Sequence, residues 1–349
     1  RLAGRPQRHH RRKKSRVPNV GFNPLGIQKS GPFDVPGELA RKWMQEPANP
    51  NAELNQKILR PYWNGDDVTG RPRDYWFIDL PLGLTEADAS LYVSPFAHIS
   101  DAKDDDGKTV KELRADLGDR AGPRWWEPHW PRPEMRRRIA DVARYIVTPE
   151  TAQHRIFVWL THPILADKNL IVVPRSDDTT FGILHSRFHE VWSLRKGSDL
   201  QDRPRYTHTS TFATFPFPKK FAPNIPSVKY ATDAQAKAIA AAAAKLNELR
   251  ENWLNPADLI DFAPEVVPGL PDRILPKDEA AAKELKKRTL TNLYSTRPAW
   301  LDHAHRALDE AVAEAYGWGD DWRAGILTDD EILARLFKLN QERAAKQAK

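Results

Sequence analysis

The 349-residue sequence contains no cysteine, which excludes disulfide bonds and every metal site built on thiolates. It also lacks any apolar run that approaches the roughly 20 residues needed to cross a bilayer. No apolar segment of the signal-peptide kind leads the sequence. These absences predict a protein that works in the reducing cytoplasm.

The residues that are present indicate a folded chain. Hydrophobic residues make up 40% of the sequence, and it contains 12 Trp and 13 Phe. A chain of this length can bury a sizeable core and form about two domains. The composition therefore argues against a largely disordered protein.

Acidic residues are missing from the first stretch of the chain. Residues Arg1 to Arg16 hold eight Lys or Arg and no Asp or Glu, so they contribute +8 to a formal net charge of +7. The remaining residues sum to about −1, so any affinity for a polyanion must come from a local patch together with this segment. We expect residues 1–31 to be a disordered basic tail. It is either a phosphate-binding arm or a remnant of sequence upstream of a truncation.

Four short β-type runs set the expected fold class. They lie at residues 144–149, 155–160, 169–174 and 180–184, and most of the gaps between them are too short for helical crossovers. We therefore predict an α+β fold, with a mixed or antiparallel sheet and attached helices, followed by an all-α C-terminal part. The expected units are residues 32–220, a long helix within 221–256, a proline-rich linker at 257–277 and helices over 278–349.

Tryptophan and proline are concentrated in residues 123–133. Trp125, Trp126 and Trp130 stand among four prolines there. Two interpretations are open, a rigid knot in the core, as large aromatics commonly form, or a platform on which bases stack. A helix is expected from Glu134, and its three successive arginines cannot all face one direction.

The stretch from Thr179 to Pro218 combines several patterns. After the β-type run at 180–184, a helix is expected from about 185 to 195, with Ser186, Arg187 and His189 on its outer face. A cationic loop and a run of Thr, Ser, His and Tyr follow. Such groups suit the reading of base edges and the binding of phosphates. The alternative is a core strand and helix with an ordinary polar loop.

The same stretch carries a family resemblance. FGILHSRFHEVW (181–192) followed by RYTHTSTFATFPFP (205–218) resembles the target-recognition region of large single-chain bacterial adenine-specific DNA methyltransferases of the MmeI-like restriction–modification type. Three further blocks resemble that family in its order: ILRPYWNGDDVTGRPRDYWFIDL (58–80), PRWWEPHWPRPEMRRRIADVARYIVTP (123–149) and RTLTNLYSTRPAWLDHAHRALDEAVAEAYGW (288–318). The resemblance covers the chain from about Pro32 onward.

The resemblance implies a function in DNA modification. The parent enzyme would transfer a methyl group from S-adenosylmethionine to the N6 amine of adenine in double-stranded DNA, and this chain would choose the sequence. Its partners would be duplex DNA and a methyltransferase catalytic domain or subunit. Within the region of resemblance, we expect DNA contacts from side chains able to bind phosphates or base edges: Arg144, Thr148, Arg155, Arg175, Ser186, Arg187, His189, Arg203, Arg205, Tyr206, Thr207, Thr209 and Thr211.

Catalytic motifs are not found in this sequence. Binding the methyl donor needs a glycine-rich strand-to-helix turn, whereas Gly317-Trp318-Gly319 follows a helix. Asn23-Pro24-Leu25-Gly26 departs from the family's Asn-Pro-Pro-Tyr loop at its third and fourth positions. His185 and His189 have metal-ligand spacing but no third ligand. We expect no catalytic residue, metal or cofactor in this chain, which leaves a stand-alone specificity or assembly subunit and a non-functional gene remnant as alternatives.

Overall fold

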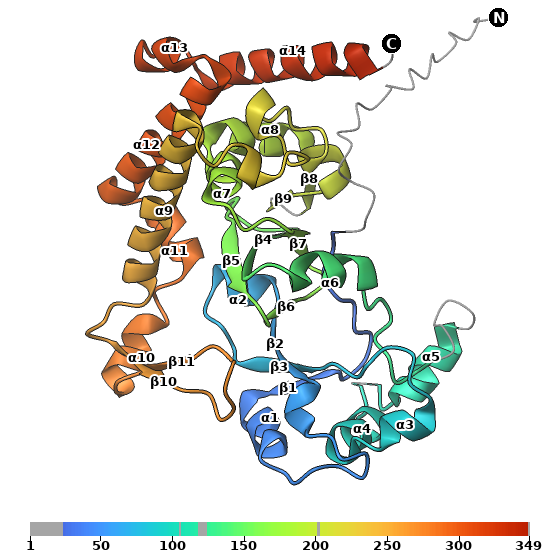
Figure 1. Ribbon diagram of the computed structural model, residues 1–349. Coiled ribbons are helices and arrows are strands. Elements are labelled where there is room, and N and C mark those ends of the chain that lie inside the picture. The colour runs from blue at the N-terminus through green and yellow to red at the C-terminus, as the bar shows by residue number, and fades with distance from the viewer. Residues whose placement is uncertain (1–23, 105, 118–123, 201–202, 348–349) are drawn as a thin grey trace, which may run out of the picture.

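The computed structural model describes residues 24–104, 106–117, 124–200 and 203–347. Figure 1 shows the N-terminal elements at the bottom, a central sheet above them and helices at the top. Two long helices, α9 (Ala234–Leu254) and α12 (Ala299–Tyr316), run side by side along one flank. The fold is a mixed α+β arrangement followed by a mostly helical C-terminal region, as predicted.

The N-terminal part is built on a four-stranded sheet in the order β1 (Asp34–Pro36), β3 (Tyr75–Ile78), β2 (Leu59–Trp63) and β6 (Leu165–Ala166). Because β6 comes from later in the chain and pairs in parallel with β2, it joins this part to the central sheet. The helices here are α1 (Gly37–Met44), the 3-10 turn η1 (Asn55–Lys57), α2 (Gly65–Thr69), α3 (Glu86–Ser90), α4 (Val93–Asp101) and α5 (Val110–Leu117).

The central sheet is antiparallel, in the order β5 (Val158–Thr161), β4 (Arg144–Pro149) and β7 (Leu170–Val173), and α6 (Pro133–Ala140) precedes it. The bounds of β4 are those predicted from the sequence. Its register places Pro149 opposite Leu170, so the turn after β4 and the turn before β7 meet at one edge of the sheet. This edge is where the candidate site forms.

The prediction of a disordered tail through residue 31 is wrong for its last residues. Leu25 forms a β-bridge with Ile171, and Ile27 is fully buried with its N–H 2.8 Å from the carbonyl of Ala166. Gly26 is required at this point, because a Cβ atom there would lie 2.2 Å from the Ala166 carbonyl oxygen. Residues 1–23, which include the basic segment, lie outside the described residues.

The predicted strand at 180–184 is a helix, α7 (Asp178–His185), and α8 (Arg187–Lys196) follows it after a break at Ser186. The Asp177 side chain caps α7 by accepting a hydrogen bond from the Thr180 N–H at 2.8 Å. All residues from 179 to 185 are buried, so no polar face marks the helical period. A short apolar run of this kind does not separate strand from buried helix.

The predicted linker at 257–277 contains a two-stranded hairpin, β10 (Ile260–Ala263) and β11 (Arg273–Pro276). The other elements are β8 (Ser198–Leu200), β9 (Arg203–Arg205), the π-helical turn η3 (His208–Phe212), η4 (Lys219–Phe221), η5 (Ser227–Lys229), α10 (Glu279–Leu285), α11 (Leu290–Thr296), α13 (Gly319–Arg323) and α14 (Asp329–Gln347). Across the described ranges, no helix is both long and apolar enough to span a bilayer.

Candidate functional site

The β8–β9 hairpin lies against the turn that follows β4. Arg205 forms a β-bridge with Thr151, and the Tyr206 N–H donates to the Glu150 carbonyl at 2.6 Å. The Arg205 guanidinium donates twice to Oε1 of Glu150, at 2.6 and 2.9 Å, while 47% of its side chain stays exposed. Arg205 is therefore held in place and remains accessible.

A polar hollow of about 300 Å³, here called the junction pocket, opens beside this contact. Its walls come from α2 in the N-terminal part, from the turns after β4 and before β7 in the central part, and from α11 in the C-terminal part. Three parts of the chain therefore meet in it. The lining offers amide, hydroxyl and carboxylate groups, among them Asn64, Thr151, Gln153, Asn169 and Thr291. Such groups can donate and accept hydrogen bonds at the edges of bases.

A second hollow of about 200 Å³, here called the β7 pocket, lies along the same strand. Val173 at the end of β7 lines it, together with Arg138 of α6 and His208 and Phe212 of η3. Because Asn169 of the junction pocket immediately precedes β7, the two hollows lie at successive positions along one strand. Two residues of the polar run after Tyr206, His208 and Phe212, thus line the β7 pocket.

Six of the predicted contact residues are partly or fully exposed. Arg205 and Thr209 are exposed, and Arg144, Arg175, Arg187 and Thr207 are half-buried. The Arg144 guanidinium lies 3.9 Å above the Trp159 ring and pairs with Asp178 at 2.8 Å. Arg187 pairs with Glu190 and with Asp329 at the start of α14. Arg144, Arg187 and Arg205 thus each meet a carboxylate in the free protein.

Ser186 and His189 do not lie on an outer face, which corrects the sequence prediction, because both are completely buried. The Ser186 hydroxyl donates to the Ile183 carbonyl at 2.7 Å. His189 donates from Nδ1 to the Leu184 carbonyl at 2.9 Å and accepts at Nε2 from the hydroxyl of buried Tyr206 at 3.1 Å. Burial lowers the pKa of His189 to about 3, so the imidazole stays neutral.

Thr148, Arg155 and Thr211 are also buried and serve the interior. Arg155 donates to the Thr148 hydroxyl at 3.0 Å, to the Pro149 carbonyl at 2.6 Å and to the Pro204 carbonyl at 3.1 Å. Burial lowers the pKa of Arg155 to about 10. This arginine connects β4 to β9 and so positions Arg205 without facing solvent.

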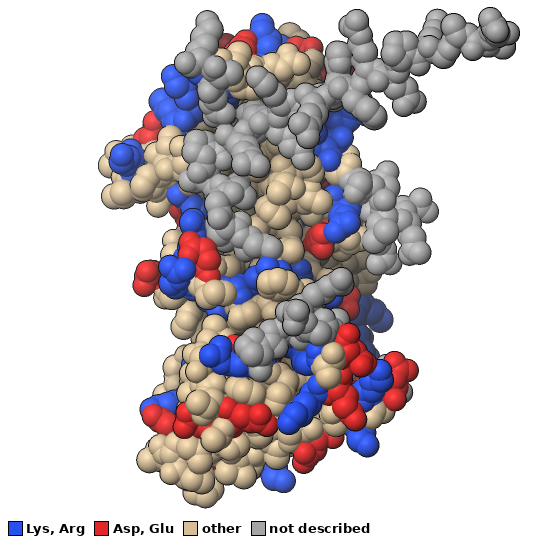
Figure 2. All heavy atoms as spheres, turned by 90° about the vertical axis from the view of Figure 1, so that its right-hand side faces the viewer, with Lys and Arg blue, Asp and Glu red and all other residues tan. Residues whose placement is uncertain are grey.

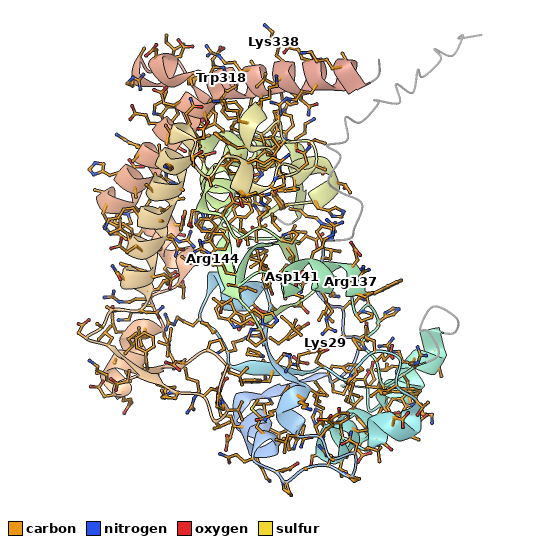
Figure 3. All side chains as sticks on the ribbon, viewed as in Figure 1. Lys29, Arg137, Asp141, Arg144, Trp318 and Lys338 are labelled. Carbon is orange, nitrogen blue, oxygen red and sulfur yellow. The ribbon has the colours of Figure 1, made fainter. Side chains whose placement is uncertain are left out.

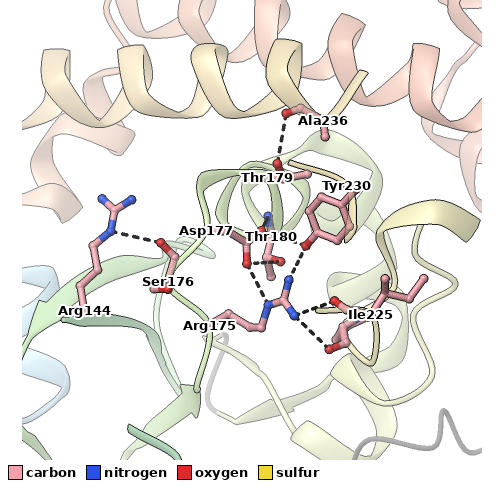
Figure 4. Close-up of polar contacts among 10 residues, drawn as sticks. Arg144, Arg175, Ser176, Asp177, Thr179, Thr180, Ile225, Tyr230 and Ala236 are labelled. Atoms are coloured by element: carbon pink, nitrogen blue, oxygen red, sulfur yellow. Dashed lines mark hydrogen bonds and ion pairs between the residues drawn. The ribbon is translucent and has the colours of Figure 1, made fainter. Parts of the chain in front are cut away.

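Arg175 is mostly buried and links loops behind the surface (Figure 4). Its guanidinium donates to Asp177 at 2.8 Å, to the Ile225 carbonyl at 2.8 Å and to the Tyr230 hydroxyl. Figure 4 shows Arg144 standing apart from this cluster, bonded to the Ser176 carbonyl. The side chain of Arg203 lies outside the described residues.

Sequence reasoning missed the polar residues of the junction pocket. Thr151 and Asn169 are far apart in the chain and meet only through the β4–β7 register. The signal that could have revealed them is the antiparallel pairing of the two predicted strands, which brings both turns to one edge. As for metals, His185 accepts at Nε2 from Arg250 at 2.7 Å, and in the described parts of the chain no three potential ligands cluster.

Comparison with models of protein families gives a match over part of this chain. Residues 108–219 match the family model described as "MmeI, target recognition domain". The matched region holds the central sheet, α7, α8, the β8–β9 hairpin and the polar run. No curated protein matches the chain. The resemblance inferred from the sequence blocks is therefore confirmed for the target recognition domain.

A solved structure of the Type IIL restriction–modification enzyme MmeI in complex with DNA has a similar fold. The TM-score is 0.59 at 19% identity, and the match covers 92% of this chain but 35% of that one. At this identity, the likeness shows a shared fold that extends beyond the family match into the N-terminal and C-terminal parts.

Proposed function

We propose that this chain, which contains a target recognition domain of the MmeI type, reads the sequence of duplex DNA for an S-adenosylmethionine-dependent adenine-N6 methyltransferase of a restriction–modification system. The chain spans 35% of the length of the MmeI structure it resembles. Methyl transfer in this proposal needs a catalytic domain or subunit in addition to the 349 residues of this sequence.

The observation that carries the proposal is the position of Arg205 beside the junction pocket. An arginine fork suits the O6 and N7 atoms of guanine, and Asn or Gln amides suit the N6 and N7 atoms of adenine. Asn169 and Gln153 line the hollow of about 300 Å³, and Arg205 pairs with Glu150, which is also in its wall. MmeI itself was crystallised with DNA bound.

The charge balance of the surface is compatible with DNA binding. The ion pair between Arg205 and Glu150 is partly exposed, and such pairs stabilise a protein by about 0–1 kcal/mol. A phosphate or a guanine edge can therefore replace the carboxylate at little cost. The same holds for Arg144 with Asp178 and for Arg187 with Asp329.

The test is selection from a duplex pool with a randomised centre, followed by mobility shifts with the enriched sequence at moderate salt. We expect one sequence to be enriched and Arg205→Ala to weaken its binding by about 5- to 150-fold, the range for a good base contact. Arg306→Ala is the matched control, because Arg306 is an exposed arginine of α12 paired with Asp302. Absence of enrichment, or equal binding by Arg205→Ala and the wild type, would contradict the proposal.

A second candidate function, an assembly module, has an observation of its own. Phe262 and Ile274 lie directly opposite each other on the β10–β11 hairpin and are 65% and 42% exposed. Adjacent exposed apolar side chains can form part of a surface that binds another protein. If the chain is a specificity subunit, Phe262→Ser should abolish co-elution with a methyltransferase subunit of such a system while DNA binding persists.

A further inference from the structure

The tryptophan-rich stretch divides into a buried part and an exposed part. Trp125 and Trp126 are buried and contact each other edge to face, as the core interpretation predicts. Trp130 is different, because 49% of it is exposed. The proposed reading of duplex DNA gives the exposed indole of Trp130 no role.

The Trp130 ring is held in position by its neighbours. The His129 ring stacks on it with centroids 5.2 Å apart and planes inclined by 25°. The Trp130 backbone exchanges hydrogen bonds with Gln28 at 3.0 and 3.1 Å, which fixes the residue against the segment before β1. An aromatic side chain already held in one orientation loses little conformational entropy when a ligand stacks on it.

Arg132 lies over the same ring, with its guanidinium carbon 5.5 Å from the ring centroid. Its backbone is left-handed, with φ 57° and ψ 54°, a conformation that costs a non-glycine residue energy and often occurs at binding sites. Its side chain donates from Nε to the Gly26 carbonyl at 3.4 Å. Burial lowers its pKa, and no carboxylate in those parts of the chain pairs with it.

Further cations lie on the segments that adjoin this stretch, since Lys168 is bonded to the residue before Gln28, and Arg137 and Arg138 are on α6. Lys168 is exposed, its N–H bonds the Ile27 carbonyl at 3.0 Å, and no ion pair involves it within the described ranges. Arg137 and Arg138 on α6 follow Arg132 and share one acid, Glu134. Figure 3 shows Lys29 and Arg137 close together near the middle of the molecule, and Figure 2 shows Lys and Arg, with acidic residues among them, around the middle of the face it presents. Among the acids nearby, Glu134 pairs with Arg137 and Arg138, Asp34 pairs with Lys29, and Asp141 lies close to Arg137 in the view of Figure 3.

We propose that Trp130, Arg132 and Lys168 form a binding site for unpaired nucleotides of single-stranded DNA. A base would stack on the exposed part of the indole, and the two cations, which have no acid partner within the described residues, would bind the flanking phosphates. Aromatic rings beside a cationic groove are the usual means of binding single strands, because every base offers a π-face. Bases inside an intact duplex are stacked on each other and cannot reach such a ring. The site is thus additional to the surface proposed to read duplex DNA.

The experiment measures binding of a fluorescent oligothymidylate to the full chain by anisotropy, with a fully paired duplex titrated in parallel. Trp130→Ala should bind oligothymidylate about 5- to 150-fold more weakly than the wild type, because it loses one stacked base. Its binding of duplex should be unchanged. Trp130→Phe should recover part of the affinity. Arg132→Gln and Lys168→Gln should each weaken binding and reduce its dependence on salt.

Leu194→Ala is the matched control, because Leu194 is an equally exposed apolar residue on α8. The proposal is overturned if Trp130→Ala binds oligothymidylate as tightly as the wild type, or if the wild type does not bind it. Binding of oligothymidylate without any duplex binding would refute the proposed function and leave this inference standing. Binding of duplex without binding of oligothymidylate would refute this inference and leave the proposed function standing.

Discussion

Arg155 and Arg205 are the pair of residues that best separates folding from DNA reading. Both were predicted from the sequence to contact DNA, and the structure places them on opposite sides of the same strand contact. Arg155 is buried beneath β9 and donates to three neutral oxygen atoms, whereas Arg205 is partly exposed and pairs with Glu150. Replacing each by alanine should give opposite phenotypes.

The magnitude for Arg155→Ala follows from the acceptors left behind. The carbonyls of Pro149 and Pro204 lose a charged donor, and each buried unpaired group costs about 1–3 kcal/mol. Thr148 keeps its own 2.7 Å bond to the Ile156 carbonyl. Removing a buried charge offsets part of the loss. We expect a net loss of about 3 kcal/mol, which lowers Tm by roughly 4 °C because the unfolding entropy of 349 residues is about 0.7 kcal/mol/K.

Arg205→Ala should change the stability by no more than about 1 kcal/mol, since it removes a partly exposed ion pair. Its effect should appear in DNA binding instead, as a loss of affinity for the selected sequence. Thermal melts followed by circular dichroism and mobility shifts on the same preparations give both quantities. If Arg155→Ala had the same Tm as the wild type but lost DNA binding, the structural role of Arg155 would be refuted. If Arg205→Ala unfolded, the assignment of Arg205 to the surface would fail.

Three further predictions test the site, the fold and its response to pH. Asn169→Ala should weaken binding of the selected duplex by about 5- to 150-fold, measured by mobility shifts, without changing the Tm of the protein, measured by thermal melts. Gly26→Ala should lose about 1–3 kcal/mol or more in urea titrations, because its Cβ would overlap the Ala166 carbonyl, whereas Gly65→Ala, with 3.7 Å of room, should not. Burial lowers the pKa values of His189 and His305 to about 3, below the roughly 6.5 of the unfolded chain. Their contribution to stability should be complete above pH 6.5 and be lost as the pH falls toward 3, which urea titrations at a series of pH values would measure.

Local sequence patterns predicted much of the scaffold. The β-branched run at 144–149 forms β4 with the predicted bounds, and the helix expected at 185–195 is α8, shifted by one or two residues. The strand expected at 180–184 failed because a fully buried helix shows no polar face. The hairpin at 260–276 was missed because four prolines between 257 and 277 suggested a linker.

Which polar side chains are buried could not be predicted from local pattern. Ser186 and His189 look like an outer helical face, but their hydrogen-bond partners are a preceding carbonyl and the hydroxyl of Tyr206. Tyr206 comes from a loop 17 residues away, and only the folded chain shows that it meets the imidazole. The junction pocket depends on the register between β4 and β7, and finding it would have required pairing the two predicted strands rather than reading each one alone.

The pattern of ion pairs suggests how the two proposed sites divide the binding of DNA. Arg144, Arg187 and Arg205 each meet a carboxylate, so contact with a phosphate releases one ion pair as it forms another and adds little net attraction. Such a surface favours partners that offer hydrogen-bond geometry as well as charge, which is what base edges provide. Arg132 and Lys168 have no such acids among the described residues, and they attract phosphates regardless of sequence. Duplex reading should therefore depend weakly on salt, and binding at Trp130 should depend on it strongly.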